Sequence, residues 1–267
     1  MSGNPVKIKL CGLSRPADID SVNEARPDYC GFIINVPKSI RNTTPAQVRA
    51  LRKNLSPQII PVGVFRNEPV ENVAELLLDG TIGVAQLHGN EDEDYIRRLR
   101  TYGTFFIIQA FRVPVPGEIS DIRTRSPENP FPIRNAAEPG IGEPPCQGKA
   151  AFEPTDCSAG NAFSSWADMV NKSSADLVLL DNGGGGTGKT FEWTLANQIQ
   201  RPFLLAGGIG PDNITEALDQ LHPWGVDMSS SVETDGKKDR EKMFAAVSRV
   251  REWNRAHREP IKDRKET

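Results

Sequence analysis

One alternation runs along almost the whole chain and limits the folds that it can adopt. Short apolar or β-branched runs are separated by segments with the apolar periodicity of amphipathic helices. The runs that predict strands cover residues 7–11, 29–34, 59–65, 84–88, 105–111, 177–181, 203–206 and 226–230. The segments that predict helices cover residues 45–54, 69–78, 93–100, 163–172, 194–200, 212–221 and 239–255. Strands that alternate with helices form a parallel sheet with right-handed crossovers.

This count of strands predicts the fold class. Eight strand–helix units in 267 residues fit an α/β protein of the closed (β/α)8 type, a TIM barrel of ordinary size. A doubly wound open sheet is the main alternative, and it would need fewer strands. We therefore expect residues 1–257 to form a single barrel domain, with functional side chains at the C-terminal ends of the strands.

Residues 114–162 interrupt the alternation with a long proline-rich segment. They hold nine of the chain's 21 prolines and show no clear periodicity. Proline lacks an N–H and fixes φ, so stretches such as PENPFP and EPGIGEPP cannot form helices or inner strands. We expect an irregular insertion after the fifth strand, either a plain surface segment or a lid or docking element. Residues 258–267 are almost all charged or polar and are expected to form a flexible tail.

Composition excludes several classes of function. The formal net charge is −3 and the pI about 5.8, so bulk electrostatics do not attract nucleic acid. No apolar run approaches the ~18 residues that span a bilayer. The first residues, MSGNPVKIK, lack the apolar core of a signal peptide. We expect a cytoplasmic, enzyme-sized domain with no nucleic-acid or membrane partner.

The cysteines and histidines do not form a metal-binding pattern. Cys11, Cys30, Cys146 and Cys157 are scattered without a C-x-x-C motif, which fits a reducing compartment rather than a disulfide scaffold or a zinc site. The three histidines are far apart and make no H-E-x-x-H motif. We therefore expect no metal site.

The glycine-rich segment GGGGTGKT at 183–190 has two interpretations. It satisfies the G-x-x-x-x-G-K-[ST] pattern of a phosphate-binding P-loop. A nucleotide hydrolase also needs a neighbouring strand that ends in a magnesium-binding Asp, and the next strand ends LLAGG without one. The alternative is that the strand LVLLD presents Asp181 at a loop that admits substrate, as α/β enzymes do. The second interpretation is favoured.

Two other strand ends predict a phosphate site. Gly207 and Gly208 follow the seventh expected strand, and Ser229 and Ser230 follow the eighth. The loops after these two strands are the usual phosphate cradle of a TIM barrel, because backbone N–H groups and a helix N-terminus favour an anion. Tight turns alone would also explain the glycines. The pairing with serines makes a phosphorylated small molecule the leading ligand class.

Cys11 and Asp181 are candidates for proton transfer. Cys11 ends the first strand, where it is either a small buried apolar residue or a thiolate base whose pKa neighbouring positive charge lowers. Asp181 is either a helix cap or a general acid. A base and an acid on different strands, beside a sugar phosphate, would suit an isomerisation by proton transfer.

These residues together resemble the phosphoribosylanthranilate isomerase family of tryptophan biosynthesis. The resemblance covers nearly the whole chain except the insertion and the tail. Its motifs are KIKLCGLS (7–14), GFIINVPKSIRNTTP (31–45), VGVFRNE (62–68), VAQLHGNED (84–92), LVLLDNGGGGTGKTFEW (177–193), LLAGGIGPDNI (204–214) and GVDMSSSVETDGKKD (225–239). No single motif is specific, but the combination is.

The resemblance implies an Amadori rearrangement of N-(5-phosphoribosyl)anthranilate without a metal or organic cofactor. It implies that Asp181 is the general acid and Cys11 the general base. It further implies that Arg41 holds the anthranilate carboxylate, for which a guanidinium fork is suited. The phosphate would bind at Gly207, Gly208, Ser229 and Ser230. Barrels of this family are monomers or homodimers.

The chain departs from the family pattern at two places. Ser231 stands where the family usually has glycine, so its Cβ is expected to crowd the phosphate or to strain the backbone. The insertion replaces a short loop. These departures keep one alternative open, a catalytically degenerate barrel that acts as a binding or regulatory module. A histidine-pathway isomerase is a further alternative, but two carboxylates would be expected there in place of Cys11 and Asp181.

Overall fold

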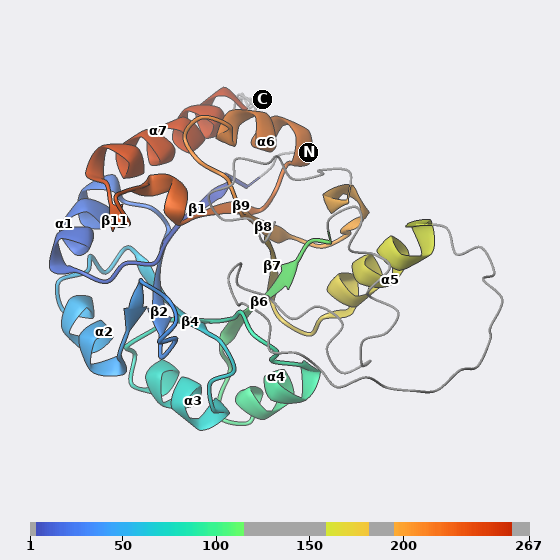
Figure 1. The fold of residues 1–267 in the computed structure, drawn as a ribbon, viewed down its shortest axis with the longest axis horizontal. Coiled ribbons are helices and arrows are strands. Elements are labelled where there is room, and N and C mark those ends of the chain that lie inside the picture. The colour runs from blue at the N-terminus through green and yellow to red at the C-terminus, as the bar shows by residue number, and fades with distance from the viewer. Residues whose placement is uncertain (1–3, 115–158, 182–194, 258–267) are drawn as a thin grey trace, which may run out of the picture.

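The computed structural model describes residues 4–114, 159–181 and 195–257, which form a closed parallel barrel surrounded by helices (Figure 1). The barrel strands are β1 (Lys7–Cys11), β2 (Tyr29–Ile34), β4 (Ile60–Phe65), β5 (Val84–Leu87), β6 (Phe106–Arg112), β7 (Leu177–Asp181), β8 (Phe203–Ala206) and β9 (Gly225–Met228). Each pairs in parallel with the next, and β1 pairs with both β9 and β2. This closure confirms the (β/α)8 barrel and excludes the open sheet.

The helices lie outside the barrel between successive strands. They are α1 (Pro16–Ala25), α2 (Pro45–Arg52), α3 (Val70–Leu78), α4 (Glu93–Arg100), α5 (Ala159–Lys172), α6 (Ile214–Leu221) and α7 (Arg240–Ala256). Helix α2 begins where Thr44 accepts a hydrogen bond from the Gln47 N–H and Gln47 bonds back to Thr44, a capping box.

Two helix predictions need correction. The predicted helix at 194–200 is only a 3₁₀ turn in its described part, η2 (Ala196–Gln198). Pro202 follows closely and disfavours helical backbone in the residue before it. Helix α1 was not predicted, because Asp18 interrupts its apolar stripe. The Asp18 carboxylate is nevertheless buried, since it accepts hydrogen bonds from the backbone N–H groups of Ser14 and Arg15.

The proline-rich insertion is shorter than its predicted range of 114–162 by at least the first residues of α5, which begins at Ala159. The remainder, residues 115–158, lies outside the described residues, and so does the predicted tail at 258–267. The segment 183–190 with the P-loop pattern also lies outside them.

Two apolar layers hold the barrel together. One layer fills the barrel interior and consists mainly of Val62, Val84, Ile108, Ala110, Leu177, Leu179, Leu204 and Ala206. The other lies between the strands and the helices, and Leu10, Cys30 and Phe32 belong to it. Because side chains alternate along a strand, residues two apart share a face. Lys9, Gln86 and Asp227 are buried polar residues on the barrel strands.

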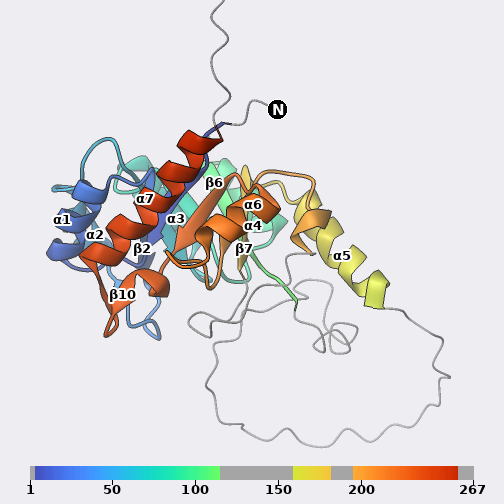
Figure 2. The same cartoon turned by 90° about the horizontal axis from the view of Figure 1, so that it is seen from above.

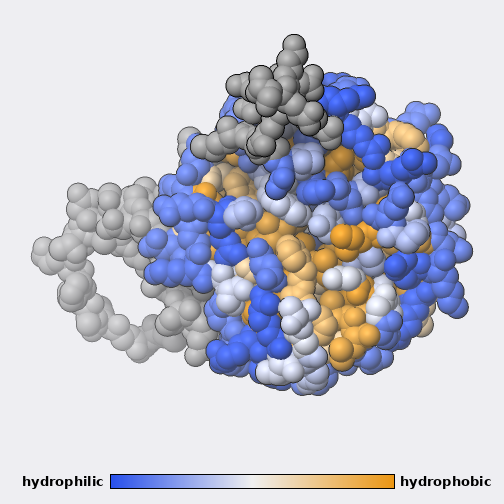
Figure 3. Space-filling view, turned by 180° about the vertical axis from the view of Figure 1, so that it is seen from behind, coloured by the Kyte–Doolittle hydropathy of each residue, from blue (hydrophilic) through white to orange (hydrophobic). Residues whose placement is uncertain are grey.

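The two ends of the barrel differ in character. Figure 1 looks onto the C-terminal ends of the strands, and Figure 2 shows the hairpin of β10 (Glu233–Thr234) and β11 (Lys237–Lys238) at that end. Two more short elements lie there, β3 (Asn42–Thr43) beside β2 and the 3₁₀ turn η3 (Ser230–Val232). The opposite end shows a gathering of apolar surface (Figure 3). In the described part of the chain, no helix is long and apolar enough to cross a membrane.

Candidate active site

Cys11 ends β1 and lies buried at the C-terminal end of the barrel. Gly12 follows with a φ of +82°, a conformation that glycine adopts without strain. Gly31 lies opposite Cys11 on β2, and a Cβ there would meet the Cys11 Sγ at 2.6 Å. Burial raises the pKa of the Cys11 thiol, and the positive charges of Lys9 and Lys238 oppose that rise. The position thus combines a desolvated sulfur with nearby cations.

Arg41 lies beside Cys11 and is held by an acidic partner. A Cβ on Gly12 would come within 2.5 Å of the Arg41 Cδ, so the absence of a side chain at Gly12 lets the arginine approach. The Arg41 Nε and Nη2 donate to the two carboxylate oxygens of Glu233 at 2.6 and 2.5 Å. Lys238 also donates to Glu233, at 2.6 Å, and to the Ser229 carbonyl at 3.0 Å. This pairing leaves the outer edge of the guanidinium, with Nη1, for a further carboxylate.

The predicted phosphate loops follow β8 and β9 at the C-terminal end of the barrel. Gly207 and Gly208 have φ values of +80° and +78°, and both are partly exposed. Asn213, at the start of α6, braces this loop because its side chain bonds both the Gly208 carbonyl and the Gly210 N–H at 2.9 Å. Ser229 and Ser230 lie partly exposed after β9, and the Ser229 hydroxyl donates to the Cys11 carbonyl at 3.1 Å.

Ser231 does not show the backbone strain that the sequence led us to expect. Its φ is not in the left-handed region, because the residue lies in the 3₁₀ turn η3. The Ser231 hydroxyl donates to the Ile209 carbonyl at 2.5 Å and so ties the loop after β9 to the loop after β8. Gly210 makes room for it, since a Cβ on Gly210 would lie 2.7 Å from the Ser231 Cβ. The prediction of a strained backbone was therefore wrong.

Asp181 ends β7, at the same end of the barrel as Cys11, and faces a histidine. The His88 Nε2 lies 3.4 Å from the Asp181 Oδ2, and both side chains are about a quarter exposed, at 24% and 21%. The Gln86 Nε2 lies 2.9 Å from the His88 Nδ1. In this orientation the Gln86 amide donates to Nδ1 and leaves its own Oε1 buried without a partner among the described residues; the matching tautomer of His88 has its proton on Nε2, toward Asp181.

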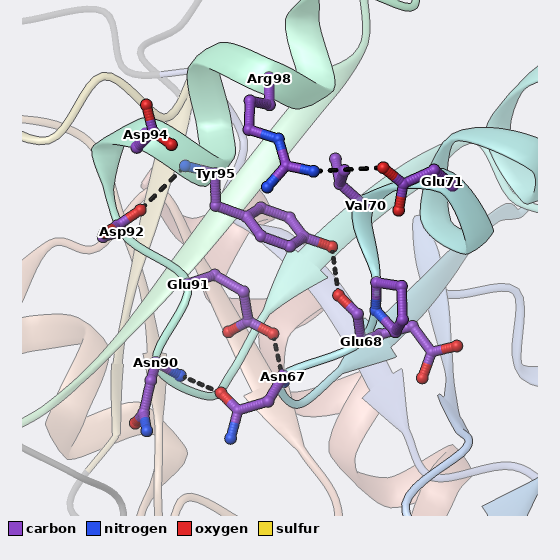
Figure 4. Close-up of a pocket in the computed structure, with 11 residues that line it drawn as sticks. Asn67, Glu68, Val70, Glu71, Asn90, Glu91, Asp92, Asp94, Tyr95 and Arg98 are labelled. Carbon is purple, nitrogen blue, oxygen red and sulfur yellow. Dashed lines mark hydrogen bonds and ion pairs between the residues drawn. The ribbon is translucent and has the colours of Figure 1, made fainter.

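A separate cavity of about 510 Å³ lies between the loops after β4 and β5 (Figure 4). Its wall is acidic, but the central carboxylate is already used. Glu91 accepts from the Asn67 N–H at 2.6 Å and from the Gly89 N–H at 2.7 Å, and the Tyr95 hydroxyl donates to the Glu68 carbonyl at 2.9 Å. These bonds brace the loop that follows His88, so we assign the cavity a supporting role.

Fold and site together define the class: a (β/α)8-barrel protein with the loop arrangement of barrel enzymes that bind phosphorylated compounds. A family model described as N-(5′phosphoribosyl)anthranilate (PRA) isomerase matches residues 8–129 and 154–249. An N-(5′-phosphoribosyl)anthranilate isomerase of Endomicrobium trichonymphae is 35% identical over 250 residues, 92% of this chain and 98% of that protein. The chain belongs to the N-(5′-phosphoribosyl)anthranilate isomerase family.

Solved structures agree with this membership. Phosphoribosyl anthranilate isomerase from Thermus thermophilus shares 26% identity and a TM-score of 0.65, over 93% of this chain and 100% of that one. A second phosphoribosyl anthranilate isomerase, 24% identical with a TM-score of 0.63, has the same fold over 92% of this chain and 99% of that one. It was solved in complex with reduced 1-(o-carboxyphenylamino)-1-deoxyribulose 5-phosphate.

The structure brings together residues that sequence reasoning did not single out. Lys9, Asp227, Glu233 and Lys238 surround Cys11 and Arg41. A signal existed for the hairpin, because Asp235-Gly236 between short polar runs is typical of a tight turn, and both residues have positive φ. No local signal marked Lys9 and Asp227, which the barrel closure brings together from opposite ends of the chain.

Proposed function

We propose that this chain catalyses the Amadori rearrangement of N-(5-phosphoribosyl)anthranilate to 1-(2-carboxyphenylamino)-1-deoxyribulose 5-phosphate, a step of tryptophan biosynthesis. Family membership supports the reaction class. The observation that carries the assignment is the placement of Cys11 and Asp181 at the C-terminal ends of two barrel strands. The active sites of TIM barrels lie at this end, so a base and an acid can act there on one substrate.

Asp181 acts first, as the general acid. It gives a proton to the furanose ring oxygen while the bond between that oxygen and C1 breaks, and the ring opens to a protonated Schiff base. His88, with its Nε2 proton directed at Asp181, orients the carboxyl group by a hydrogen bond. Partial exposure of both side chains allows Asp181 to recover its proton from water.

Cys11 then acts as the general base. The protonated Schiff base acidifies the C2–H bond, so the Cys11 sulfur takes this proton and an S–H bond forms. The C–H electron pair becomes the C1–C2 double bond, and the C1–N π pair moves to nitrogen to give a neutral enolamine. The product forms when C1 gains a proton and the C2 hydroxyl loses one. All these steps move protons only, and the scheme requires no redox cofactor.

Arg41 and the two glycine–serine loops hold the substrate at its ends. The outer edge of the Arg41 guanidinium takes the anthranilate carboxylate in a bidentate pair, while Glu233 keeps the inner edge fixed. Gly207, Gly208, Ser229 and Ser230 take the 5-phosphate through backbone N–H and hydroxyl groups. The bond from Ser229 to the Cys11 carbonyl links the phosphate loop to the base.

We place this activity in the cytoplasm, in a monomer or a homodimer. A protein of the same fold from Thermotoga maritima is described as dimeric, which makes the homodimer a concrete alternative. Light scattering on a size-exclusion column will distinguish one copy from two, and cell fractionation will test the compartment.

The test is the loss of phosphoribosylanthranilate fluorescence with purified protein. We expect turnover by the wild-type protein, and a loss of about 10³-fold or more in Cys11→Ala and Asp181→Asn, because general acid–base groups each contribute 10²–10⁴-fold. Folded wild-type protein that binds the reduced product analogue without turnover would favour the degenerate barrel. A folded protein that binds neither phosphate nor analogue would remove the proposal altogether.

A further inference from the structure

Lys9 is a fully buried lysine that the proposed mechanism does not use. It lies on β1 two residues before Cys11, so both side chains share the face of the strand that looks into the barrel. Burying an ammonium costs several kcal/mol unless an opposite charge and hydrogen bonds compensate it. The apolar residues that fill most of the barrel interior cannot supply this compensation.

The compensation comes from Asp227. In the pairing of β1 with β9, Lys9 stands directly opposite Asp227. The Lys9 Nζ donates to both carboxylate oxygens at 3.0 Å, and the exposed fraction of Asp227 is only 8%. An ammonium has three N–H donors, so this bidentate pair leaves one of them. Asp227 therefore fixes the direction of the remaining donor.

The Lys9 ammonium lies close to the proposed base. A Cβ built on Gly31 would lie 2.6 Å from the Cys11 Sγ and 3.1 Å from the Lys9 Nζ, so the two atoms flank one small space. The Lys9 ammonium and the Cys11 thiol also interact electrostatically, since each shifts the pKa of the other. Glycine at position 31 leaves open the space in which the ammonium and the sulfur meet.

The charges around Cys11 leave room for one more negative charge. Three cations face it: Lys9 from its own strand, Lys238 from β11 and Arg41 from the loop after β2. Asp227 and Glu233 neutralise two of them. In the part of the chain that the structure describes, Cys30 is a further titratable neighbour, and burial keeps its pKa high. A Cys11 thiolate would balance the third cation.

We propose that Lys9, oriented by Asp227, is a positioning residue for Cys11: its ammonium holds the sulfur by a hydrogen bond and supplies the charge that a thiolate requires in this buried place. The inference rests on the proposed role of Cys11 as the base. Burial alone would lower the pKa of Lys9, but Asp227 and Cys11 raise it above the ordinary value. The paired carboxylate thus favours the ammonium form of Lys9.

The first experiment titrates the cysteines of the wild-type chain by NMR with ¹³Cβ-labelled cysteine, which requires no reagent to reach the sulfur. Cys30 is the control within the molecule, because it is buried on the adjacent strand among apolar side chains. We expect Cys11 to ionise at a pH at least about 2 units below Cys30, a hundredfold difference in acidity. The Lys9 ¹⁵Nζ resonance should shift with the Cys11 midpoint and lose that shift in Cys11→Ser. Equal titration midpoints for Cys11 and Cys30 would overturn the inference, and so would a Lys9 ¹⁵Nζ resonance that does not shift when Cys11 titrates.

The second experiment removes the pair without leaving an unpaired charge. We expect the double variant Lys9→Met/Asp227→Asn to increase the proton affinity of the Cys11 thiolate at least tenfold, so that its titration midpoint moves to higher pH. It should lower kcat about tenfold at pH 7 with KM within threefold, and move the basic limb of kcat/KM to higher pH. A folded double variant with unchanged midpoint and profile overturns the inference while the isomerase assignment stands. If the wild type itself does not turn over substrate, the proposed function fails, and the role of Lys9 fails with it.

Discussion

The two sides of the proposed site use opposite electrostatics. On the base side, Lys9 and Asp227 are buried beside Cys11 and directly paired, and Arg41, which is 22% exposed, is paired with Glu233. On the acid side, the His88 imidazole lies between the Gln86 amide and the Asp181 carboxyl group, and the His88 and Asp181 side chains are 24% and 21% exposed.

This difference follows from what each group must do. A buried thiolate needs fixed positive charge beside it, because burial removes the water that would otherwise solvate it. An acid that must regain its proton in every cycle needs contact with water, and Asp181 is partly exposed. One barrel end can meet both needs because each strand contributes its side chains independently.

The largest expected effects are losses of kcat, and a kinetic isotope effect should distinguish the base side from the acid side. Both Cys11→Ser and Asp181→Asn should lose about 10³-fold in kcat, the range of a general acid or base. With substrate deuterated at C2, Cys11→Ser should show a primary isotope effect, because breaking C2–H limits it. Asp181→Asn should show almost none, because ring opening limits it. Asp168→Asn, at an exposed site on α5, serves as the control. Equal isotope effects in both variants would remove the division of roles.

Stability should distinguish the two sides in a second way. Asp227→Ala leaves the Lys9 ammonium buried without its partner, so we expect a loss of about 3–5 kcal/mol in the free energy of unfolding. Asp181→Ala, at a partly exposed strand end, should change it by about 1 kcal/mol or less. Urea denaturation measures both. A loss for Asp227→Ala no larger than that for Asp181→Ala would contradict the buried charge on the base side.

The pH dependence of stability should also come from the base side. Burial alone would raise the pKa of the Glu233 carboxyl, but hydrogen bonds from Arg41 and Lys238 bring it below its ordinary value of 4.5. A depressed pKa contributes stability above the unfolded value, and this contribution is lost as the pH falls through the folded one. Stability should therefore fall below pH 4.5, and Glu233→Gln should make that fall shallower. Thermal melts between pH 3 and 7 provide the measurement, and parallel curves would contradict the prediction.

The sequence predicted the barrel strands better than the side-chain interactions of the candidate site. The strands of a barrel are buried on both faces and read as apolar runs, so the predicted strands agree with the observed ones within two residues at either end. Cys11 and Asp181 were candidates from their positions at strand ends, and Arg41 was predicted through a resemblance; the structure places all three at one end of the barrel. Their chemical roles stay predictions.

The Lys9–Asp227 pair on the base side could not be predicted from the sequence, for a physical reason. Lys9 sits in KIKLC, where alternation makes any lysine look like the outward face of a half-exposed strand. Only the pairing of β1 with β9, which joins the two ends of the chain, turns this face inward and supplies Asp227. A single sequence does not show which face of a strand points into a closed barrel, because closure depends on the pairing of all the strands.

The tautomer of His88 offers a smaller test, on the acid side. Gln86 should favour the tautomer of the wild-type imidazole that has its proton on Nε2, because the amide N–H occupies Nδ1. Gln86→Leu should remove this preference and lower kcat by about threefold to tenfold. Long-range ¹H–¹⁵N correlation spectra report the tautomer directly, with His257, exposed at the end of α7, as the internal reference. A proton on Nδ1 in the wild type would mean that the Gln86 amide is reversed and that His88 offers Asp181 no N–H.

The smallest effect is expected where the chain departs from its family. Ser231→Gly restores the usual residue but removes the hydroxyl that ties the loops after β8 and β9 together. We expect a loss of about 1 kcal/mol in stability, typical of one hydrogen bond, and a rise in KM of less than threefold. Ser231→Ala separates the causes, because it loses the hydroxyl and keeps the Cβ beside Gly210. If only Ser231→Gly improves phosphate binding, the Cβ crowds the phosphate after all. If both variants weaken binding alike, the hydroxyl is what holds the two loops in register.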